Sequence, residues 1–395
     1  MSEFPLEQVR RDTRGLEHSC HFNNAGASLM PAPVVDRLTD WLRDEELRGG
    51  YEVEAARRDE LEDFYRAAAE LLNCQAHEVA YVENATRAWN MAFYGLALGA
   101  GDTVLTPLSE YGSNVIALRH QAARRGFTVE FMADDEAGVV DLEWLAQRLG
   151  DRSRPVGLIA LSHVPTGNGL VNPAAAVGAL ARAHEVPYLL DACQSLGQMP
   201  VDVQALGCDM LSGTGRKYLR GPRGTGLLYV RREFLDRLDP PFLDQHAAEL
   251  NSAERFTMRD DARRFECWER YCAGQAALAV ALRYASDLGL ASIYARVQYL
   301  AETLRGALGG VPGVEVVDGG HERCGIVTFT VAGREAEALK AGLGKRGVNV
   351  SVASGSGNLV WFEQRGLTAV VRASVHYFNT PSEIDRLIAS LLPLC

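Results

Sequence analysis

From residue 77 to about 230 the sequence alternates short apolar, β-rich runs with stretches of helical periodicity. The runs expected as strands are EVAYVE, DTVLTPL, FTVEFMA, PVGLIALSHV, VPYLLDA, CDMLSG and TGLLYV. Between them, helical periodicity marks TRAWNMAFYGLAL, NVIALRHQAARRG, VDLEWLAQRLG and PAAAVGALARAHE. Apolar strands with little alternation are typical of a sheet covered on both faces, so the pattern predicts a doubly wound α/β domain with a mainly parallel sheet.

Further regular stretches flank this region. Two polar, amphipathic helical stretches occupy about 31–73, and two long helical segments follow from about residue 270. After them come four β-rich runs with helices between: GVEVVD, GIVTFTV, VNVSVA and AVVRASV. We therefore expect the 395 residues to form an N-terminal segment near the active site (1–30), a large α/β domain (31–265) and a small α+β domain (266–395).

Several chemically versatile residues follow the predicted strands directly. In open α/β sheets, ligands bind at the carboxyl ends of the strands. The residues that fall at such ends, or just beyond, are Thr86, Tyr111, Thr166, Asp191 and Lys217. Their convergence predicts one site at this edge of the sheet.

The lysine in SGTGRKYLRG (212–221) is unusual because the chain otherwise uses arginine. Only three of the 40 basic residues are lysines, namely Lys217, Lys340 and Lys345, and the last two fit a helix surface. Arg stays protonated at physiological pH, whereas a buried or crowded Lys can lose its proton and become a nucleophilic amine. Lys217 is therefore the candidate nucleophile, with a chance position as the alternative.

A lysine that forms a Schiff base implies pyridoxal phosphate (PLP) as cofactor. PLP acts as an electron sink when its ring nitrogen is protonated, which requires a carboxylate partner. Asp191, at the end of an apolar strand, is the candidate for this partner. The alternative is a helix N-cap or turn carboxylate, a common role of Asp.

The phosphate of such a cofactor needs backbone N–H groups at a helix N-terminus. ENATRAWN offers one, with Asn84 as cap and Ala85 and Thr86 in the first turn; a plain capped helix is the alternative. Thr214 and Arg216, beside the lysine, can complete the cradle. A neighbouring cation also lowers the pKa of a lysine.

The segment LLDACQSLGQMPVDVQALGCDMLSGTGRKYLRGPRGTGLLYV (189–230) strongly resembles the PLP-binding core of the class V aminotransferases. The shared pattern is D-x-x-Q, (S/T)-x-(H/R)-K and G-P-x-G-x-G, and the resemblance runs from HFNNAGASLMP to VRASVHYFNTPSEIDRLI. That family includes cysteine desulfurases, C–S lyases and isopenicillin N epimerase-like proteins. The resemblance implies PLP fold type I and a homodimer with active sites at the subunit interface.

The resemblance also implies roles by position. Lys217 would form the Schiff base, Asp191 would pair with the pyridine nitrogen, and Gln194 would bind the phenolic oxygen or the lysine. Tyr111 takes the place of a histidine that stacks on the ring in desulfurases. The residues expected to hold the phosphate are Ala85, Thr86, Thr214 and Arg216.

The resemblance further implies a substrate site. Arg372 matches an arginine that grips the substrate carboxylate, with a structural strand-end arginine as the alternative. Asn24 and Ala25, in NNAGASL, are expected beside the substrate. Thr166 lies where some relatives have an Asn near the cofactor, and Asn168 is its rival. Segment 263–269, RRFECWE, resembles one that reaches the partner's active site.

The chain departs from cysteine desulfurases in one place. They carry a nucleophilic cysteine ahead of the carboxylate-binding arginine, but VSVASGSGNLVWFEQRGLTAVVR (350–372) contains none. Cys324 lies earlier in the chain, and Cys193 reads as a small buried side chain. We therefore expect a C–S lyase that performs β-elimination on a cysteine-derived substrate, with Trp361 and Phe362 either receiving the S-substituent or packing in the core.

Other outcomes remain open at this point. An aminotransferase or an epimerase would use the same cofactor, a desulfurase is less expected, and a PLP-binding regulator or a relative without cofactor is a different class. The net charge of −11 argues against nucleic acid or an anionic membrane as partner. The scattered cysteines and the absence of an apolar leader fit reduced thiols in a cytoplasm, and HSCH (18–21) is too isolated to predict a metal.

Overall fold

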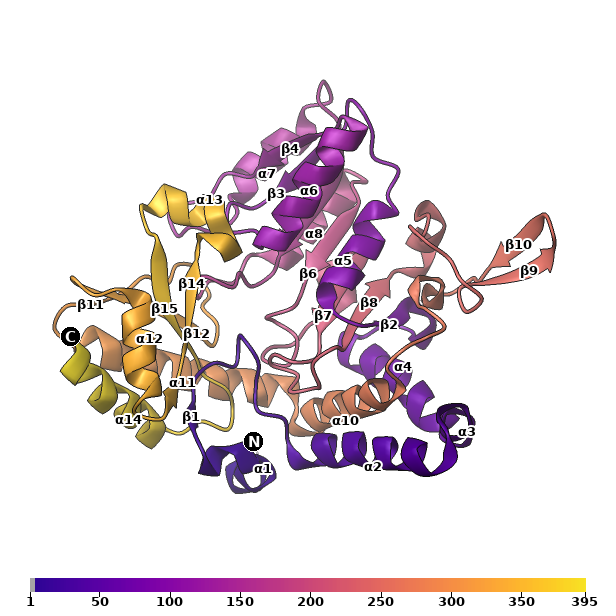
Figure 1. Ribbon diagram of the computed structural model, residues 1–395. Coiled ribbons are helices and arrows are strands. Elements are labelled where there is room, and N and C mark those ends of the chain that lie inside the picture. The colour runs from indigo at the N-terminus through magenta and orange to yellow at the C-terminus, as the bar shows by residue number, and fades with distance from the viewer. Residues whose placement is uncertain (1–3) are drawn as a thin grey trace.

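The computed structural model describes residues 4–395, and its main feature is a seven-stranded sheet in the order β2-β8-β7-β6-β5-β3-β4 (Figure 1). Strands β4, β3, β5, β6 and β7 are parallel, whereas β8 runs antiparallel to both β7 and β2. The predicted mainly parallel sheet is therefore confirmed. Its strands are β2 (Val79–Val82), β3 (Thr103–Thr106), β4 (Thr128–Phe131), β5 (Val156–Ser162), β6 (Tyr188–Asp191), β7 (Met210–Thr214) and β8 (Gly226–Val230).

Helices cover both faces of this sheet because successive strand residues point to opposite sides. Leu158 and Ala160 of β5 pack in the cluster that includes α5 and α6, while Ile159 and Leu161 pack with α7 and α8. The helices between the strands are α5 (Ala85–Tyr94), α6 (Gly112–Arg125), α7 (Leu142–Gly150), α8 (Ala174–Ala183) and the short α9 (Val203–Leu206).

The N-terminal helices lie below the sheet in Figure 1 and pack against a helix from much later in the chain. Helix α10 (Cys272–Leu288) contacts α2 and α4, and its Leu278 and Leu282 join the core beneath the large sheet. The division of the chain at residue 265 remains a prediction. The N-terminal elements are α1 (Leu6–Asp12), η1 (Arg14–Glu17), α2 (Ala32–Arg48), α3 (Gly50–Ala56), α4 (Arg58–Leu72) and η2 (Ala76–Glu78).

A second, antiparallel sheet has the order β11-β12-β15-β14. The run VNVSVA, expected as one strand, is divided: β13 (Val348–Asn349) pairs with β1 (Cys20–His21), and only β14 joins the sheet. The elements here are α11 (Leu290–Gly309), β11 (Val314–Val316), β12 (Ile326–Val331), α12 (Ala336–Gly344), β14 (Ser351–Ser354), α13 (Gly355–Arg365), β15 (Ala369–Ser374), α14 (Pro381–Leu391) and η5 (Leu392–Leu394).

A hairpin that the sequence did not predict projects from the large sheet, at the right of Figure 1. It consists of β9 (Ala248–Ser252) and β10 (Arg255–Met258), and lies between η3 (Arg232–Arg237) and η4 (Ala262–Phe265). Most of its side chains are exposed, so no buried apolar set marked it in the sequence.

Within residues 4–395 no single helix has the length and apolarity of a membrane span. Helices α10 and α11 meet that test only as a pair, and they are bent by 79°.

Candidate active site

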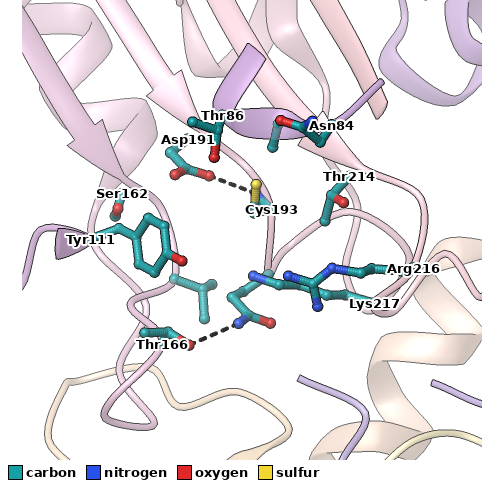
Figure 2. A pocket seen from close by; sticks show the side chains of 13 residues that line it. Asn84, Thr86, Tyr111, Ser162, Thr166, Asp191, Cys193, Thr214, Arg216 and Lys217 are labelled. Carbon is teal, nitrogen blue, oxygen red and sulfur yellow. Dashed lines mark hydrogen bonds between the residues drawn. The ribbon is translucent and has the colours of Figure 1, made fainter. Parts of the chain in front are cut away.

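A cavity opens at the carboxyl ends of the central strands, where the sequence predicted the site. Ser162 of β5 pairs with Asp191 of β6, which pairs with Ser212 of β7, so the three strands end side by side. The empty space of this cavity, including open solvent at its mouth, is about 570 Å³. It is lined by Asn84, Ala85, Thr86, Tyr111, Ser162, Val164, Thr166, Asp191, Cys193, Gln194, Thr214, Arg216 and Lys217 (Figure 2). All nine residues expected at the cofactor are in this set.

Lys217 enters the cavity from the turn that follows β7. The turn is closed by hydrogen bonds from the Arg220 N–H to the Lys217 carbonyl (3.0 Å) and from the Gly221 N–H to the Gly215 carbonyl (2.7 Å). Burial lowers the pKa of Lys217 to about 8, although Cys193 and Asp191 favour its charged form. A substantial share of this amine is therefore neutral, and nucleophilic, near pH 8.

Arg220 anchors the lysine turn, a role that the sequence reasoning missed. Its backbone adopts φ 60°, and its buried guanidinium donates to the Leu29 carbonyl (2.7 Å), the Tyr377 hydroxyl (3.0 Å) and the Thr13 hydroxyl (2.6 Å). Segments from both ends of the chain therefore hold the turn. No local sequence signal could reveal this, because the acceptors lie far away in the sequence.

Asp191 faces the cavity across from Lys217 with its two oxygens held from behind. Oδ1 accepts from the Cys193 N–H and Oδ2 from the Asn114 side chain, each at 2.9 Å. Asn114 also donates to Glu110, a buried carboxyl in the loop between β3 and α6. Glu110 and Asn114 were missed; both lie in SEYGSN, with Asn114 in the first turn of α6 and Glu110 two residues before that helix.

The N-terminus of α5 lies at the same cavity, with Thr86 beside Asp191 (Figure 2). Asn84 caps it, accepting from the Arg87 N–H at 2.9 Å, which confirms the predicted cap. The N–H groups of Ala85 and Thr86 have no acceptor within the helix because they belong to its first turn. With the side chains of Thr214 and Arg216 lining the same cavity, they form a set of donors suited to an anion.

Gln194 and Thr166 line the same cavity and are joined by a hydrogen bond. Gln194 Nε2 donates to the Thr166 hydroxyl and to the Ala25 carbonyl, each at 3.1 Å, while its buried Oε1 has no partner. An unpaired buried oxygen is costly and marks a place for a donor from a ligand. The Tyr111 ring projects into the cavity beside them (Figure 2).

Arg372 lies in β15, behind Thr166. Its Nη1 donates to the Thr166 carbonyl (3.0 Å) and hydroxyl (2.6 Å), and its Nε donates to the Ser351 hydroxyl (3.0 Å). No ion pair among residues 4–395 includes Arg372, and burial lowers its pKa to about 10. A buried cation without an acidic partner can receive a carboxylate.

Asn24, Ala25, Asn168 and Arg372 are not among the residues that line the cavity. The Asn24 side chain is buried between the Ser374 carbonyl and the Ser28 hydroxyl, and Ala25 touches the cavity only through its bond to Gln194. Asn168 is buried with both side-chain amide atoms unpaired. The roles of Asn24 and Ala25 at a substrate, and that of Asn168 as the rival of Thr166 near the cofactor, remain predictions.

The two aromatic residues of the C-terminal segment pack in the core. Trp361 and Phe362 of α13 are buried in a cluster with Ala353 and Val370. Of the two readings of these residues, the structure therefore supports core packing.

Segment 263–269 follows the hairpin at the edge of the large sheet. Arg263 stacks over Tyr65 at 3.6 Å and pairs with Glu62, whereas Trp268 is 53% exposed. Any contact with a partner's site remains a prediction. Across residues 4–395, no group of three or more His, Cys, Asp or Glu side chains is arranged to hold a metal ion.

The residues present fit PLP. The cavity offers the amine of Lys217, whose lowered pKa allows a neutral form, and the carboxylate of Asp191. It also offers a helix N-terminus for a phosphate and the aromatic ring of Tyr111. The unpaired Oε1 of Gln194 adds an acceptor with no partner inside the protein. Together these groups match the needs of a phosphorylated pyridine aldehyde.

Comparisons with known proteins identify the family of this chain. The family model for aminotransferase class-V matches residues 20–387. A probable cysteine desulfurase from Methanothermobacter thermautotrophicus is 27% identical over 390 residues, covering 96% of each chain.

Solved structures of similar proteins share the fold of this chain. The apo structure of a cysteine desulfurase from Thermococcus onnurineus NA1 has a TM-score of 0.92 and 25% identity, and covers 100% of this chain and 98% of that one. The cystine C–S lyase C-DES, bound to its product cysteine persulfide, has a TM-score of 0.85 and covers 96% and 99%. At 24% identity this second likeness shows the fold alone. Since the family model spans nearly the whole chain, the protein belongs to the aminotransferase class-V family of PLP-dependent fold type I enzymes.

Proposed function

We propose that this enzyme is a C–S lyase that performs β-elimination on a cysteine-derived amino acid, such as an S-conjugate or a sulfoxide. One observation carries the choice of reaction: the site offers no thiolate to accept sulfur. Segment 350–372 has no cysteine, and among residues 4–395 Cys193 is the one cysteine that lines the cavity.

Cys193 is a poor sulfur acceptor. Burial, reinforced by the negative charge of Asp191, raises the pKa of its thiol well above the usual range. The thiolate is the nucleophilic form of cysteine, so this side chain stays inert at neutral pH. Sulfur released at this site would therefore leave as part of a small molecule.

The residues of the cavity support elimination in the following way. When bound, PLP supplies an electron sink for the pair left at Cα. Arg372 would bind the substrate carboxylate, and Lys217, which also holds the cofactor, would take the proton from Cα. Asp191 would accept a hydrogen bond from the ring nitrogen.

The overall reaction is balanced without an oxidant or reductant. The C–S bond at Cβ breaks and the sulfur keeps its electron pair, so a thioether substrate releases a thiol and a sulfoxide releases a sulfenic acid. Water then hydrolyses the remaining three-carbon unit to pyruvate and ammonium. Lys217, which lines the cavity, would return a proton.

The second candidate is a cysteine desulfurase, because relatives that match nearly the whole chain carry that name. A desulfurase would convert cysteine to alanine, whereas a lyase yields pyruvate. An aminotransferase would act only with an oxo acid, and an epimerase would change only the configuration at Cα.

Product analysis separates these reactions. The holoenzyme is offered cysteine, S-substituted cysteines and cysteine sulfoxides, first without and then with an oxo acid. Catalytic pyruvate without an oxo acid supports the lyase. Alanine from cysteine, turnover that depends on an oxo acid, or a changed Cα configuration alone would each replace the lyase by the corresponding alternative.

The proposal includes a homodimer in a reducing cytoplasm. Tyr51, Trp268 and Tyr271 are exposed around one cleft beside segment 263–269, and the eight cysteines are free. Exposed aromatic clusters favour protein interfaces. Light scattering of the purified protein tests the assembly, and a monomeric mass would contradict it.

A further inference from the structure

We infer that Glu110 is a positioning residue for cofactor binding: it fixes the Asn114 amide, which in turn fixes Asp191. The inference concerns the chain's hold on PLP and applies whichever bond the enzyme breaks. It rests on the role proposed above for Asp191 at the ring nitrogen.

Glu110 receives hydrogen bonds from five donors. Oε1 accepts from the Tyr111 N–H (2.8 Å), the Asn114 side chain (2.8 Å) and the Ser162 hydroxyl (2.5 Å). Oε2 accepts from the Ser162 N–H (2.9 Å) and the Thr106 hydroxyl (3.3 Å). The ionised form of this carboxyl can accept from all five.

Asn114 connects the two carboxyl groups. Its Nδ2 donates to Glu110 Oε1 at 2.8 Å and to Asp191 Oδ2 at 2.9 Å, and both contacts are buried. Rotating the amide by half a turn would aim its oxygen at two carboxylates, so Glu110 allows one orientation only. With the Cys193 N–H on Oδ1, Asp191 is held at both oxygens.

Holding these carboxyl groups so close has an energetic consequence. Burial, followed by the charge of Asp191, raises the pKa of Glu110 to about 7. A buried carboxyl in this position disfavours its own charge, and the hydrogen bonds from Ser162, Asn114 and Tyr111 offset only part of that cost. The arrangement instead preorganises Asp191 and adds negative potential behind it, which favours a protonated ring nitrogen.

Glu110 differs in this respect from Glu78, another buried carboxyl next to the same sheet. Glu78 accepts from the Gln75 and Arg232 N–H groups at 2.9 Å and 2.8 Å and precedes β2, at the opposite end of that strand from Asn84. Replacing Glu78 therefore reports what the loss of a buried carboxylate does to the fold alone.

The test is a double-mutant cycle on the apoprotein reconstituted with PLP. E110Q, N114A and the double variant are compared in PLP dissociation constant and in the visible absorption spectrum, with E78Q as the matched control. We expect E110Q and N114A each to raise the dissociation constant about tenfold and to shift the visible band. The double variant should be no worse than N114A, because Glu110 acts through Asn114.

Each other outcome has a defined meaning. An unchanged dissociation constant and spectrum in E110Q, or additive losses in the double variant, would overturn the inference. If E110Q does not fold, N114A alone decides, and normal PLP binding by N114A overturns it. D191N is measured in parallel: if D191N binds PLP normally, the role of Asp191 is wrong, whereas a defect confined to D191N refutes only the link through Glu110 and Asn114.

Discussion

The cavity at the large sheet and the buried Arg372 behind Thr166 hold their charged groups in different ways. On the side of the large sheet, Asp191 is fixed by the Cys193 N–H and by Asn114, and Glu110 lies behind it. On the side of the small sheet, Arg372 contacts only neutral oxygens of Thr166 and Ser351. Both oxygens of Asp191 therefore have hydrogen-bond donors within the protein, whereas the positive charge of Arg372 is not neutralised by an acidic side chain.

This difference separates two tasks. Groups that are satisfied before a ligand arrives are preorganised, as a permanently held cofactor requires. A cation whose partners are neutral has affinity left for an exchangeable anion. We therefore expect changes on the large-sheet side to affect the cofactor, and changes on the small-sheet side to affect the substrate.

The largest expected effect tests the cofactor side of this comparison. Lys217→Ala should abolish the yellow colour of the enzyme with PLP and lower kcat about 100- to 10,000-fold, because amine and base are lost together. Absorbance spectra and single-turnover assays measure both. Lys340→Ala, at an exposed lysine paired with Glu337, is the control and should match the wild type. A yellow, active Lys217→Ala enzyme would contradict the assignment.

The second prediction concerns the small-sheet side. Arg372→Ala should raise KM for amino-acid substrates roughly 10- to 100-fold, since a charge-assisted pair is lost, while PLP stays bound. The KM of Arg372→Lys should lie between those of the wild type and Arg372→Ala, because lysine keeps the charge and loses the planar fork. Steady-state kinetics and cofactor content measure the effect. Loss of PLP with an unchanged KM would reverse the division of tasks.

The third prediction uses the pKa of Lys217. Because burial lowers it from 10.5 to about 8, the neutral amine gains about tenfold per pH unit below pH 8 and little above it. The initial rate at which apoprotein gains its visible band with PLP should rise in this way from pH 6 and level off above about 8. A rate that keeps rising to pH 10 would show an ordinary lysine.

The smallest expected effect tests how the two sides are joined. Asn358 of α13, which follows the small-sheet strand β14, donates to the carbonyls of Ser109 (2.7 Å) and Glu110 (3.1 Å), which follow the large-sheet strand β3. Asn358→Ala should lower the free energy of unfolding by about 1 kcal/mol, measured by chemical denaturation. Leu359→Ala, at an exposed neighbour in α13, is the control. Equal stability of the two variants would mean that this contact adds nothing.

The sequence was most informative where local pattern and chemistry coincide. The seven runs between 77 and 230 became the seven strands of the large sheet, since apolar runs bounded by turns leave few alternatives. The residues at their ends meet in one cavity because parallel strands end at one edge. The hairpin β9–β10 was missed because it is exposed and has no buried face.

The sequence by itself predicted the doubly wound sheet, and its resemblance to the class V aminotransferases implied the cofactor and the nine expected cofactor residues that line one cavity. Only the tertiary structure decided how those residues are held. Arg220 reaches segments from both ends of the chain, Glu110 meets Asp191 through Asn114, and Trp361 turns into the core. Such contacts join residues far apart in sequence, and they depend on packing that no local pattern encodes.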